Sequence, residues 1–507
     1  MLFVKLVMKV KIEVNKWADH LNHWKLFLTE MLKLTQDKPG DQTKIKRQLT
    51  TITSIQYGAV LNPNVLLSFL QPSAPKITYS DLRWNINLNA SQKLAVKAAI
   101  SDNVLTLIQG PPGTGKTQVI AETCLQLYRS NPDIRILVCS ETHIAVNNVL
   151  ERVAQLDNDM RIIRIQDKEE SSSIQDFTTE TILDNYSTWI DYNVTNKEIA
   201  KVLKDSFIHT ENIRSTEKSL FLSSNLVGMT CNRVGAYNFN NLNELFDIVI
   251  IDEVCKATLP EILMPLSVSN KAVLVGDPKQ LPPIFSTEER SVIESITNNN
   301  LHEHMYINDL FEQSNHALFL DTQYRMCSQI AKLISNLFYS GKLIDGRKEE
   351  IIDAVNWIDY KPTRKWPLQE EVNSNNPKIY NDDECNIILQ LLNLIQTKEK
   401  NSSIAVIAPY KAQVNKLRCI LQYVDLNISI DTVDGFQGKE SDIVIFSLTR
   451  NIGTFRFLSD ERRLNVALSR AKNKIYFVGD IRYSSKNDLL KKIIKKSKVS
   501  EFVVEHK

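Results

Sequence analysis

Residues 104–117, VLTLIQGPPGTGKT, decide the fold. The run from Val104 to Gln109 is apolar and rich in β-branched residues, which predicts a buried strand. Gly110 to Thr117 then match the phosphate-binding pattern G-x-x-x-x-G-K-[ST] without a gap. Mostly apolar residues recur at helical spacing from 119 to 127, so the loop opens a helix whose N-terminus attracts anions. Strand, loop and helix in this order predict a nucleoside triphosphate site.

Each part of this loop has a chemical role. The glycines allow the backbone to curl until its N–H groups point at a phosphate chain. Lys116 places a positive charge on the β- and γ-phosphates, and the Thr117 hydroxyl can bind Mg²⁺. The predicted nucleotide-binding residues of the loop are Gly110, Pro111, Pro112, Gly113, Thr114, Gly115, Lys116 and Thr117. The motif predicts ATP or a similar nucleotide, but kinases, GTPases, transporters and helicases all share it.

Length and composition set the outer bounds. The chain has 507 residues, of which 43% are hydrophobic and 24% charged, as in an ordinary globular protein of two to four domains. The net charge of +2 gives no overall attraction to nucleic acid, although a local basic groove stays compatible with it. Seven cysteines without a C-x-x-C pair predict a reduced, cytoplasmic protein, with a nuclear location left open.

The N-terminal part carries no motif that names a function. Residues 2–14 alternate between apolar and polar, which predicts a half-buried strand and not a targeting segment. Residues 17–34 have helical spacing, and residues 1–85 together form a predicted accessory region where a protein partner could bind. The polar, serine-rich residues 167–220 look like an insertion. No run approaches 18 apolar residues, so we expect no membrane span.

Two adjacent carboxylates follow a second apolar strand. Residues 246–251 lead into Asp252 and Glu253, at the strand end where ligands gather in an open α/β sheet. Asp252 can hold the Mg²⁺ bound by Thr117, and Glu253 can accept the proton of an attacking water. A further strand ends in residues 276–283, GDPKQLPP, which place Gln280 where it can contact a γ-phosphate.

Gln92 lies about a dozen residues before the P-loop strand. Its amide can reach a purine edge with two hydrogen bonds, or it can be an ordinary exposed glutamine.

Six ordered motifs now resemble a known family. They are GPPGTGKT (110–117), DEVCKAT (252–258), GDPKQLPP (276–283), QYRM (323–326), TVDGFQGKE (432–440) and RRLNVALSRA (462–471). The order is similar to that of superfamily 1 helicases, in the branch containing senataxin and the up-frameshift RNA helicase, over residues 86–482. The resemblance implies an α/β fold: two tandem RecA-like, doubly wound parallel-sheet domains of a P-loop NTPase, at 86–305 and 306–507.

The second half of the chain supports two such domains independently. Strand-like runs at 404–408, 429–433, 442–447 and 474–478 alternate with helical patterns, and this half has no P-loop of its own. By the resemblance, Arg325 and Arg470 are arginine fingers, which would otherwise form surface salt bridges. Tyr324 would lie near the adenine, and Gly438 and Glu440 near the ribose or the γ-phosphate.

The resemblance also implies a partner, single-stranded DNA or RNA. Thr142, Thr230 and Thr432 would hydrogen-bond backbone phosphates, and Pro409 and Tyr410 would contact bases. Tyr410 can equally be a packed core tyrosine. The sequence departs from the family where DE-x-x-Q has Lys256 in place of glutamine.

Two functions follow from these residues. The first is an ATP-dependent translocase and helicase, with 5′→3′ polarity implied by the branch alone. The second is an ATPase switch, stimulated by nucleic acid, that remodels complexes without unwinding. The residues do not distinguish DNA from RNA, which depends on contacts to the 2′-OH.

Overall fold

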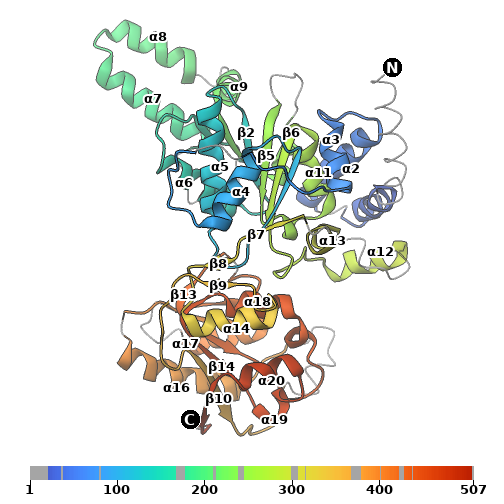
Figure 1. Ribbon diagram of the computed structural model, residues 1–507, viewed down its shortest axis with the longest axis vertical. Coiled ribbons are helices and arrows are strands. Elements are labelled where there is room, and N and C mark those ends of the chain that lie inside the picture. The colour runs from blue at the N-terminus through green and yellow to red at the C-terminus, as the bar shows by residue number, and fades with distance from the viewer. Residues whose placement is uncertain are drawn as a thin grey trace. The chain divides into compact units, whose positions relative to one another are not determined.

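The computed structural model describes residues 21–35, 38–78, 82–166, 177–208, 213–237, 245–297, 306–313, 316–366, 378–399, 401–421, 428–436 and 438–504. Contacts divide the chain into two compact units (Figure 1). The first comprises Met1–Gly110, Lys116–Pro278 and Pro282–Leu320. The second comprises Pro111–Gly115, Lys279–Leu281 and Asp321–Lys507. The strand predicted over residues 2–14 lies outside the described residues.

The first unit contains a seven-stranded sheet in its described part, and all of its strand pairs are parallel. In spatial order its strands are β3 (Ile162–Arg164), β4 (Leu226–Thr230), β2 (Ile136–Ser140), β5 (Phe246–Asp252), β6 (Ser269–Gly276), β1 (Leu105–Gln109) and β7 (Leu318–Phe319). The predicted strands around the P-loop and the Asp-Glu pair are confirmed. The short edge strands β3 and β7 were not predicted, because two or three residues carry no periodic signal.

Helices cover both faces of this sheet. A helix spans residues 21–34. The others are α2 (Pro39–Gln56), α3 (Pro63–Leu70), α4 (Ala90–Ile100), α5 (Lys116–Ser130), α6 (His143–Ala154), α7 (Thr179–Asn193), α8 (Lys197–Ile208), α9 (Ile213–Ser223), α10 (Cys231–Val234), η2 (Val254–Lys256), α11 (Leu259–Ser267), α12 (Thr287–Thr297) and α13 (Tyr306–Gln313). Successive strand residues point to opposite faces, so Leu107 packs in one apolar cluster and Ile108 in the other. This two-sided burial explains the continuous apolar runs in the sequence.

The described part of residues 1–85 belongs to the first unit. Trp24, Ile52 and Phe69 are buried in the same cluster as the strand residue Leu107. These helices therefore form one covering layer of the sheet. The predicted domain boundary at 305/306 also differs from the observed one, since the first unit runs on to Leu320. The reason is β7, which pairs with β1 and completes the first sheet.

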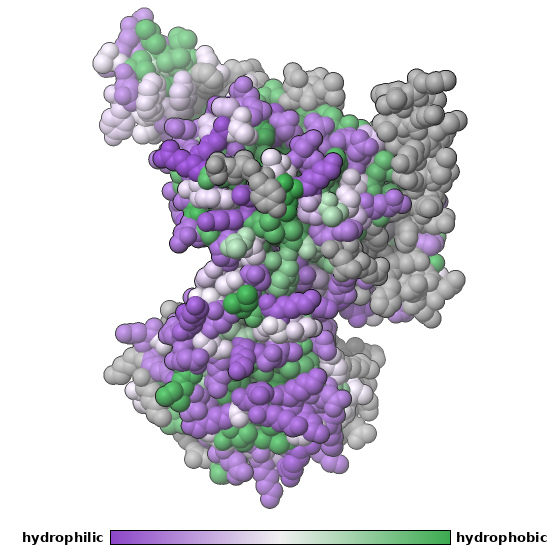
Figure 2. All heavy atoms as spheres, viewed as in Figure 1, coloured by the Kyte–Doolittle hydropathy of each residue, from purple (hydrophilic) through white to green (hydrophobic). Residues whose placement is uncertain are grey.

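The polar insertion is helical where the structure describes it. Helices α7 and α8 form an outlying pair in the first unit (Figure 1), and apolar side chains lie among their exposed residues (Figure 2). These exposed side chains are Trp189, Tyr192, Ile199 and Val202. None of the described helices in either unit has the length and apolar character needed to cross a membrane.

The second unit contains a six-stranded parallel sheet in its described part. In spatial order its strands are β12 (Ile428–Thr432), β11 (Ile404–Ala408), β13 (Ser441–Ser447), β14 (Ala471–Val478), β10 (Val355–Tyr360) and β15 (Lys498–Phe502). A separate pair is formed by β8 (Thr322–Gln323) and β9 (Ile344–Asp345). The helices are α14 (Ser328–Phe338), α16 (Asp382–Lys398), α17 (Lys411–Leu421), η4 (Arg456–Ser459), α18 (Glu461–Leu468), α19 (Ile481–Ser484) and α20 (Asp488–Ile494).

The predicted strands of this half are confirmed at β11, β12, β13 and β14. Strands β10 and β15 were not predicted. The lysine-rich C-terminal residues begin in helix α20. Residues 498–502, however, pair in parallel with β10 at the sheet edge, where exposed lysine is compatible with a strand.

All seven cysteines are free. Six are buried and Cys419 is exposed. Burial raises the pKa of Cys124 to about 12.

Gly228 on β4 allows α6 to approach the sheet closely. A Cβ placed there would lie 2.6 Å from Leu150 Cδ1 and 2.9 Å from Val146 Cγ1. We expect Gly228→Ala to destabilise the first unit by about 1–3 kcal/mol through overpacking. The measurement is the urea unfolding midpoint. Gly40→Ala is the control, because a Cβ at Gly40 meets nothing within 4 Å. Equal midpoints for the two variants would contradict the close packing.

Candidate functional site

Lys116, in the first unit, lies close to Gly110, which follows β1. The Lys116 amine donates to the Gly110 carbonyl at 3.0 Å and lies 3.6 Å from a Glu253 carboxylate oxygen. A Cβ at Gly110 would collide with the Lys116 side chain, so only glycine fits there. Gly113 and Gly115 have positive φ values of 74° and 79°, the left-handed region that glycine tolerates. The loop therefore has the tight backbone curvature that its glycines were predicted to allow.

The Asp252–Glu253 pair ends β5 beside this lysine. Asp252 is 4% exposed, and its Oδ1 accepts the Glu253 backbone N–H at 2.8 Å. Burial, and secondly the charge of Glu253, raise the pKa of Asp252 to about 7. Glu253 has φ 51° and ψ 35°, a left-handed conformation that is unusual for a residue with a side chain. Such strain of about 1–3 kcal/mol is typical of functional sites.

These residues fit a magnesium–nucleotide complex. Thr117 is half-buried and offers a hydroxyl, and Asp252 offers a buried carboxylate, the hard oxygen ligands that Mg²⁺ prefers. The described residues contain no cluster of three or more His, Cys, Asp or Glu side chains suited to a metal. A cation held here would therefore take its remaining ligands from phosphates and water, as Mg²⁺ usually does.

Gln280 and Arg470 lie together in the second unit. Both side chains are 4% exposed, and Arg470 Nη2 lies 3.5 Å from Gln280 Oε1. The Arg470 guanidinium also donates to the carbonyls of Val466 at 3.0 Å and Lys439 at 3.3 Å. Arg470 is thus a buried, oriented cation and not a surface salt bridge.

Arg325 is oriented by a second set of contacts. Its Nε lies 2.6 Å from a Glu440 carboxylate oxygen, and its Nη1 donates to the Ser469 carbonyl at 3.3 Å. Glu440 also pairs with Lys472 at 2.9 Å. Burial opposes ionisation of Glu440, but the charges of Arg325 and Lys472 outweigh it and lower the pKa of Glu440. Glu440 therefore holds Arg325 in this structure, in addition to the nucleotide role predicted for it.

The remaining residues predicted to bind the nucleotide, Tyr324, Gly438 and Gln92, differ in exposure and in their contacts. Tyr324 is 47% exposed, and its backbone N–H donates to the Gly113 carbonyl at 2.9 Å within the second unit. Gly438 has φ 80° and open space around its Cβ position. Gln92 is 4% exposed, and its amide oxygen accepts the Asn89 N–H in a capping box at the start of α4. The amide oxygen of Gln92 thus takes part in capping the helix. The contact of this amide with a purine through two hydrogen bonds stays a prediction.

The three threonines predicted to contact phosphates lie at or just after the end of a strand. Thr142 precedes α6, Thr230 precedes α10, and Thr432 ends β12. The Thr230 hydroxyl accepts the Arg233 N–H at 3.2 Å, and the Thr432 hydroxyl accepts the Gly435 N–H at 3.1 Å. Both hydroxyls therefore organise a turn locally. Gln437, within the segment quoted around Thr432, lies outside the described residues.

Pro409 and Tyr410 follow β11 and are half-buried. The Tyr410 hydroxyl accepts a hydrogen bond from Arg450 Nε at 2.7 Å, and its ring lies 6.2 Å from that of Phe457. The Arg450 guanidinium is also 5.2 Å from the Tyr410 ring centre. The Tyr410 ring is therefore packed against Phe457 and Arg450, and its contact with a base stays a prediction.

A buried carboxyl network lies beneath Arg450. Glu384 Oε2 accepts hydrogen bonds from the Ser447 hydroxyl at 2.5 Å and the Thr449 N–H at 2.8 Å. Thr449 has a φ of 69°, and the next residue is Arg450. The network therefore fixes the bend that aims Arg450 at Tyr410. Burial raises the pKa of Glu384 to about 8 despite these hydrogen bonds.

Lys256 faces acidic groups in the first unit. It lines a 330 Å³ pocket together with Glu141, Thr258, Glu261 and Lys44. Lys44 and Glu261 form an ion pair at 2.6 Å. Burial raises the pKa of Glu141, while the charge of Lys256 acts to lower it. The charge of Lys256 also acts to lower the pKa of Asp252, but burial and the charge of Glu253 outweigh it.

Comparison with known families agrees with these motifs. Two family models, AAA_11 and AAA_12, each described as an AAA domain, match residues 87–207 and 190–288 for the first and 297–482 for the second. Their order along the chain follows the order of the two units.

Similar proteins carry helicase names. The DNA polymerase alpha-associated DNA helicase A of Saccharomyces cerevisiae is 34% identical over 78% of this chain and 65% of its own. The ATP-dependent helicase upf1 of Schizosaccharomyces pombe is 29% identical over 90% of this chain and 51% of its own, and Helicase SEN1 of Saccharomyces cerevisiae is 26% identical over 94% and 26%. The chain belongs to the superfamily 1 helicases, in the branch of senataxin and the up-frameshift helicase.

Members of this helicase family are ATP-hydrolysing enzymes. This chain spans less than two thirds of the first relative's length and smaller shares of the other two. Among solved structures, the arterivirus nonstructural protein 10 helicase is similar, with a TM-score of 0.40 and 12% identity over 80% of this chain and 63% of its own.

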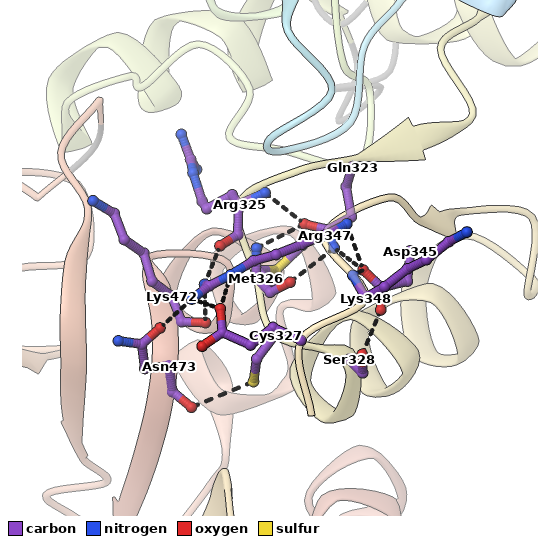
Figure 3. A network of polar contacts seen from close by, with 11 residues as sticks. Gln323, Arg325, Met326, Cys327, Ser328, Asp345, Arg347, Lys348, Lys472 and Asn473 are labelled. Atoms are coloured by element: carbon purple, nitrogen blue, oxygen red, sulfur yellow. Dashed lines mark hydrogen bonds and ion pairs between the residues drawn. The ribbon is translucent and has the colours of Figure 1, made fainter. Parts of the chain in front are cut away.

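The residues that hold the motifs in place carry little signal in the sequence. Gln323 is fully buried, and its amide donates to the Met326 carbonyl and to Asp345, each at 2.9 Å. Its carbonyl oxygen accepts the N–H groups of Arg325 and Met326 (Figure 3). Gln323 was quoted in a motif without a role. The sequence did offer one indication, since Gln323 is a polar residue two positions before the predicted arginine finger Arg325.

Glu384 predicts a pH dependence of stability. Its pKa is about 8 in the folded chain against an ordinary value of 4.5, so the folded state keeps a proton that the unfolded state loses. Stability from this group is complete below about pH 4.5 and falls as the pH rises to about 8. Glu384→Gln should remove that part of the fall.

The measurement compares urea midpoints at about pH 5 and pH 8.5. The exposed Glu461→Gln is the matched control and should keep the wild-type slope. Equal slopes for wild type and Glu384→Gln would show that Glu384 is ionised in the folded state.

Proposed function

We propose that the chain hydrolyses ATP with Mg²⁺ and uses the energy to move on single-stranded DNA or RNA, in the 5′→3′ direction. The observation that carries the proposal is the first-unit site, where Lys116 lies 3.6 Å from Glu253 beside the buried Asp252. These groups match the parts required for phosphoryl transfer: a cation on the phosphates, a base for water and a carboxylate for the metal.

The proposed mechanism assigns one task to each residue. Lys116 neutralises charge on the β- and γ-phosphates. Thr117 and Asp252 would hold Mg²⁺, which would supply positive charge that stabilises the phosphates. Glu253 orients the attacking water and accepts its proton. Because Lys116 already lies beside Glu253, a bound triphosphate would compete for this amine and leave the carboxylate available as a base.

The arginines of the second unit complete the proposal. Arg470 and Arg325 are oriented cations with defined acceptors, and in the proposed reaction they stabilise the charge that develops on the γ-phosphate. Such a residue contributes roughly 10³–10⁵ in rate. Repeated ATP binding and hydrolysis would then switch the protein between two conformations that bind the strand differently. Movement along the strand in steps requires two such states.

The proposed strand contacts are Thr142, Thr230, Thr432, Pro409 and Tyr410. Support comes from their positions at or after strand ends in parallel sheets, where ligands collect in open α/β folds. Hydroxyl contacts to phosphates bind without sequence preference. The partly open Tyr410 ring can add about 1–3 kcal/mol by stacking on a base.

A second candidate is an ATPase switch that remodels complexes without unwinding. The specific observation in its favour is Lys256, whose charge is engaged with Glu141 and Asp252 where the family has a neutral glutamine. A tailed-duplex assay separates the two, because efficient ATP-dependent unwinding excludes the switch. If unwinding is absent, Lys256→Gln tests whether this charge is the cause.

The first test is ATP hydrolysis by the chain alone and with poly-dT or poly-U. We expect stimulation by at least one polymer and a loss of turnover of at least about 10³-fold in Lys116→Ala, because Lys116 supplies phosphate charge. Lys271→Ala is a matched control, since Lys271 forms an exposed pair with Asp102. Stimulation by one polymer names the substrate class.

Two outcomes would count against the proposal. Turnover that survives Lys116→Ala would move the chemistry elsewhere. Turnover that no single strand changes, at low or moderate salt, would remove the translocase and leave a partner-activated ATPase.

A further inference from the structure

Arg347 joins two segments of the second unit that are distant in sequence. Its Nη1 donates to the Arg325 carbonyl at 2.7 Å and to the Lys472 carbonyl at 3.0 Å. Its Nη2 donates to Asn473 Oδ1 at 2.7 Å (Figure 3). One guanidinium therefore connects the loop that carries Arg325 to the start of β14, two residues after Arg470.

The conformation of Arg347 is itself fixed. Asp345 Oδ1 accepts the backbone N–H groups of Arg347 at 3.1 Å and Lys348 at 3.2 Å, while its Oδ2 accepts the Ser328 hydroxyl at 2.6 Å. Arg347 Nε also donates to Glu349 at 2.6 Å. The side chain is therefore held at both ends, by a turn at its backbone and by four acceptors at its head.

Backbone contacts run parallel to this bridge. The Cys327 N–H donates to the same Lys472 carbonyl at 2.8 Å, and the Cys327 thiol lies 3.3 Å from the Asn473 carbonyl. Arg325 in turn donates to Ser469, directly before Arg470. The segments that carry Arg325 and Arg470 are thus joined by one set of hydrogen bonds, and Arg347 makes several of these bonds.

We propose that Arg347 is a positioning residue that sets the relative placement of Arg325 and Arg470 for the reaction. The inference rests on the proposed ATPase function. It lies outside the six motifs, since Arg347 belongs to none of them. Lysine can replace it only in part, because a single ammonium lacks the planar fork that reaches four separate acceptors.

The test measures kcat and KM for ATP in the full chain with a stimulating polymer. We expect Arg347→Gln to lower kcat by about 10- to 100-fold, since a misplacement near 1 Å costs about that much, while KM changes less than about twofold. Arg347→Lys should recover only part of the loss. Asn473→Ala, which removes one acceptor, should give a smaller loss and covers the case in which Arg347→Gln folds poorly.

A double-mutant comparison separates positioning from general stability. If Arg347 acts through Arg325, adding Arg347→Gln to Arg325→Ala should lower kcat by much less than it does alone. Arg418→Gln is the matched control, because Arg418 also donates to a backbone carbonyl, that of Ile430, and should leave kcat at the wild-type value.

The outcomes are distinguishable. Multiplicative losses in the double variant, or an unchanged kcat in Arg347→Gln, overturn the inference and leave the ATPase proposal intact. Absence of turnover in the wild-type chain overturns the ATPase proposal and this inference together.

Discussion

Two adjacent carboxylates at the end of β5 impose the main constraint on this molecule. Asp252 is buried and lies next to the charge of Glu253, so its pKa is raised to about 7. A site that costs energy in this way persists only if its surroundings hold it in place. The parallel sheet does so, because the apolar faces of β5 are covered by helices on both sides. Lys116 then supplies the nearest compensating charge.

The second unit handles positive charge in a comparable way. Arg325 and Arg470 are oriented by carbonyls and by Glu440, and neither depends on solvent for its polar partners. The cost of burying a guanidinium is offset when its donors have acceptors. The polar frame around Gln323 and Asp345 exists for the same reason, since a loop with this many charges needs internal hydrogen bonds to keep one conformation.

Sequence reasoning recovered the parts of the fold whose signal is local. The P-loop, the strand before Asp252 and the strand at 404–408 each carry a periodic or motif signal within a few residues, and the structure has them where expected. The missed strands β7 and β15 have almost no intrinsic signal and form because a neighbouring strand offers an edge. The roles of Gln323 and Glu384 could not be predicted either. Their partners, such as Asp345 and the Thr449 backbone N–H, are distant in sequence.

The placement of the cysteines has a practical consequence. Six thiols are buried, and burial raises the pKa of groups such as Cys124, so they present little thiolate to a reagent. Cys419, on α17, is the exposed one of the seven. Helix α17 packs near β12, the strand that ends in Thr432. A maleimide dye should therefore label the native chain at Cys419. Fluorescence from the labelled helix can then report on the second unit without an engineered cysteine.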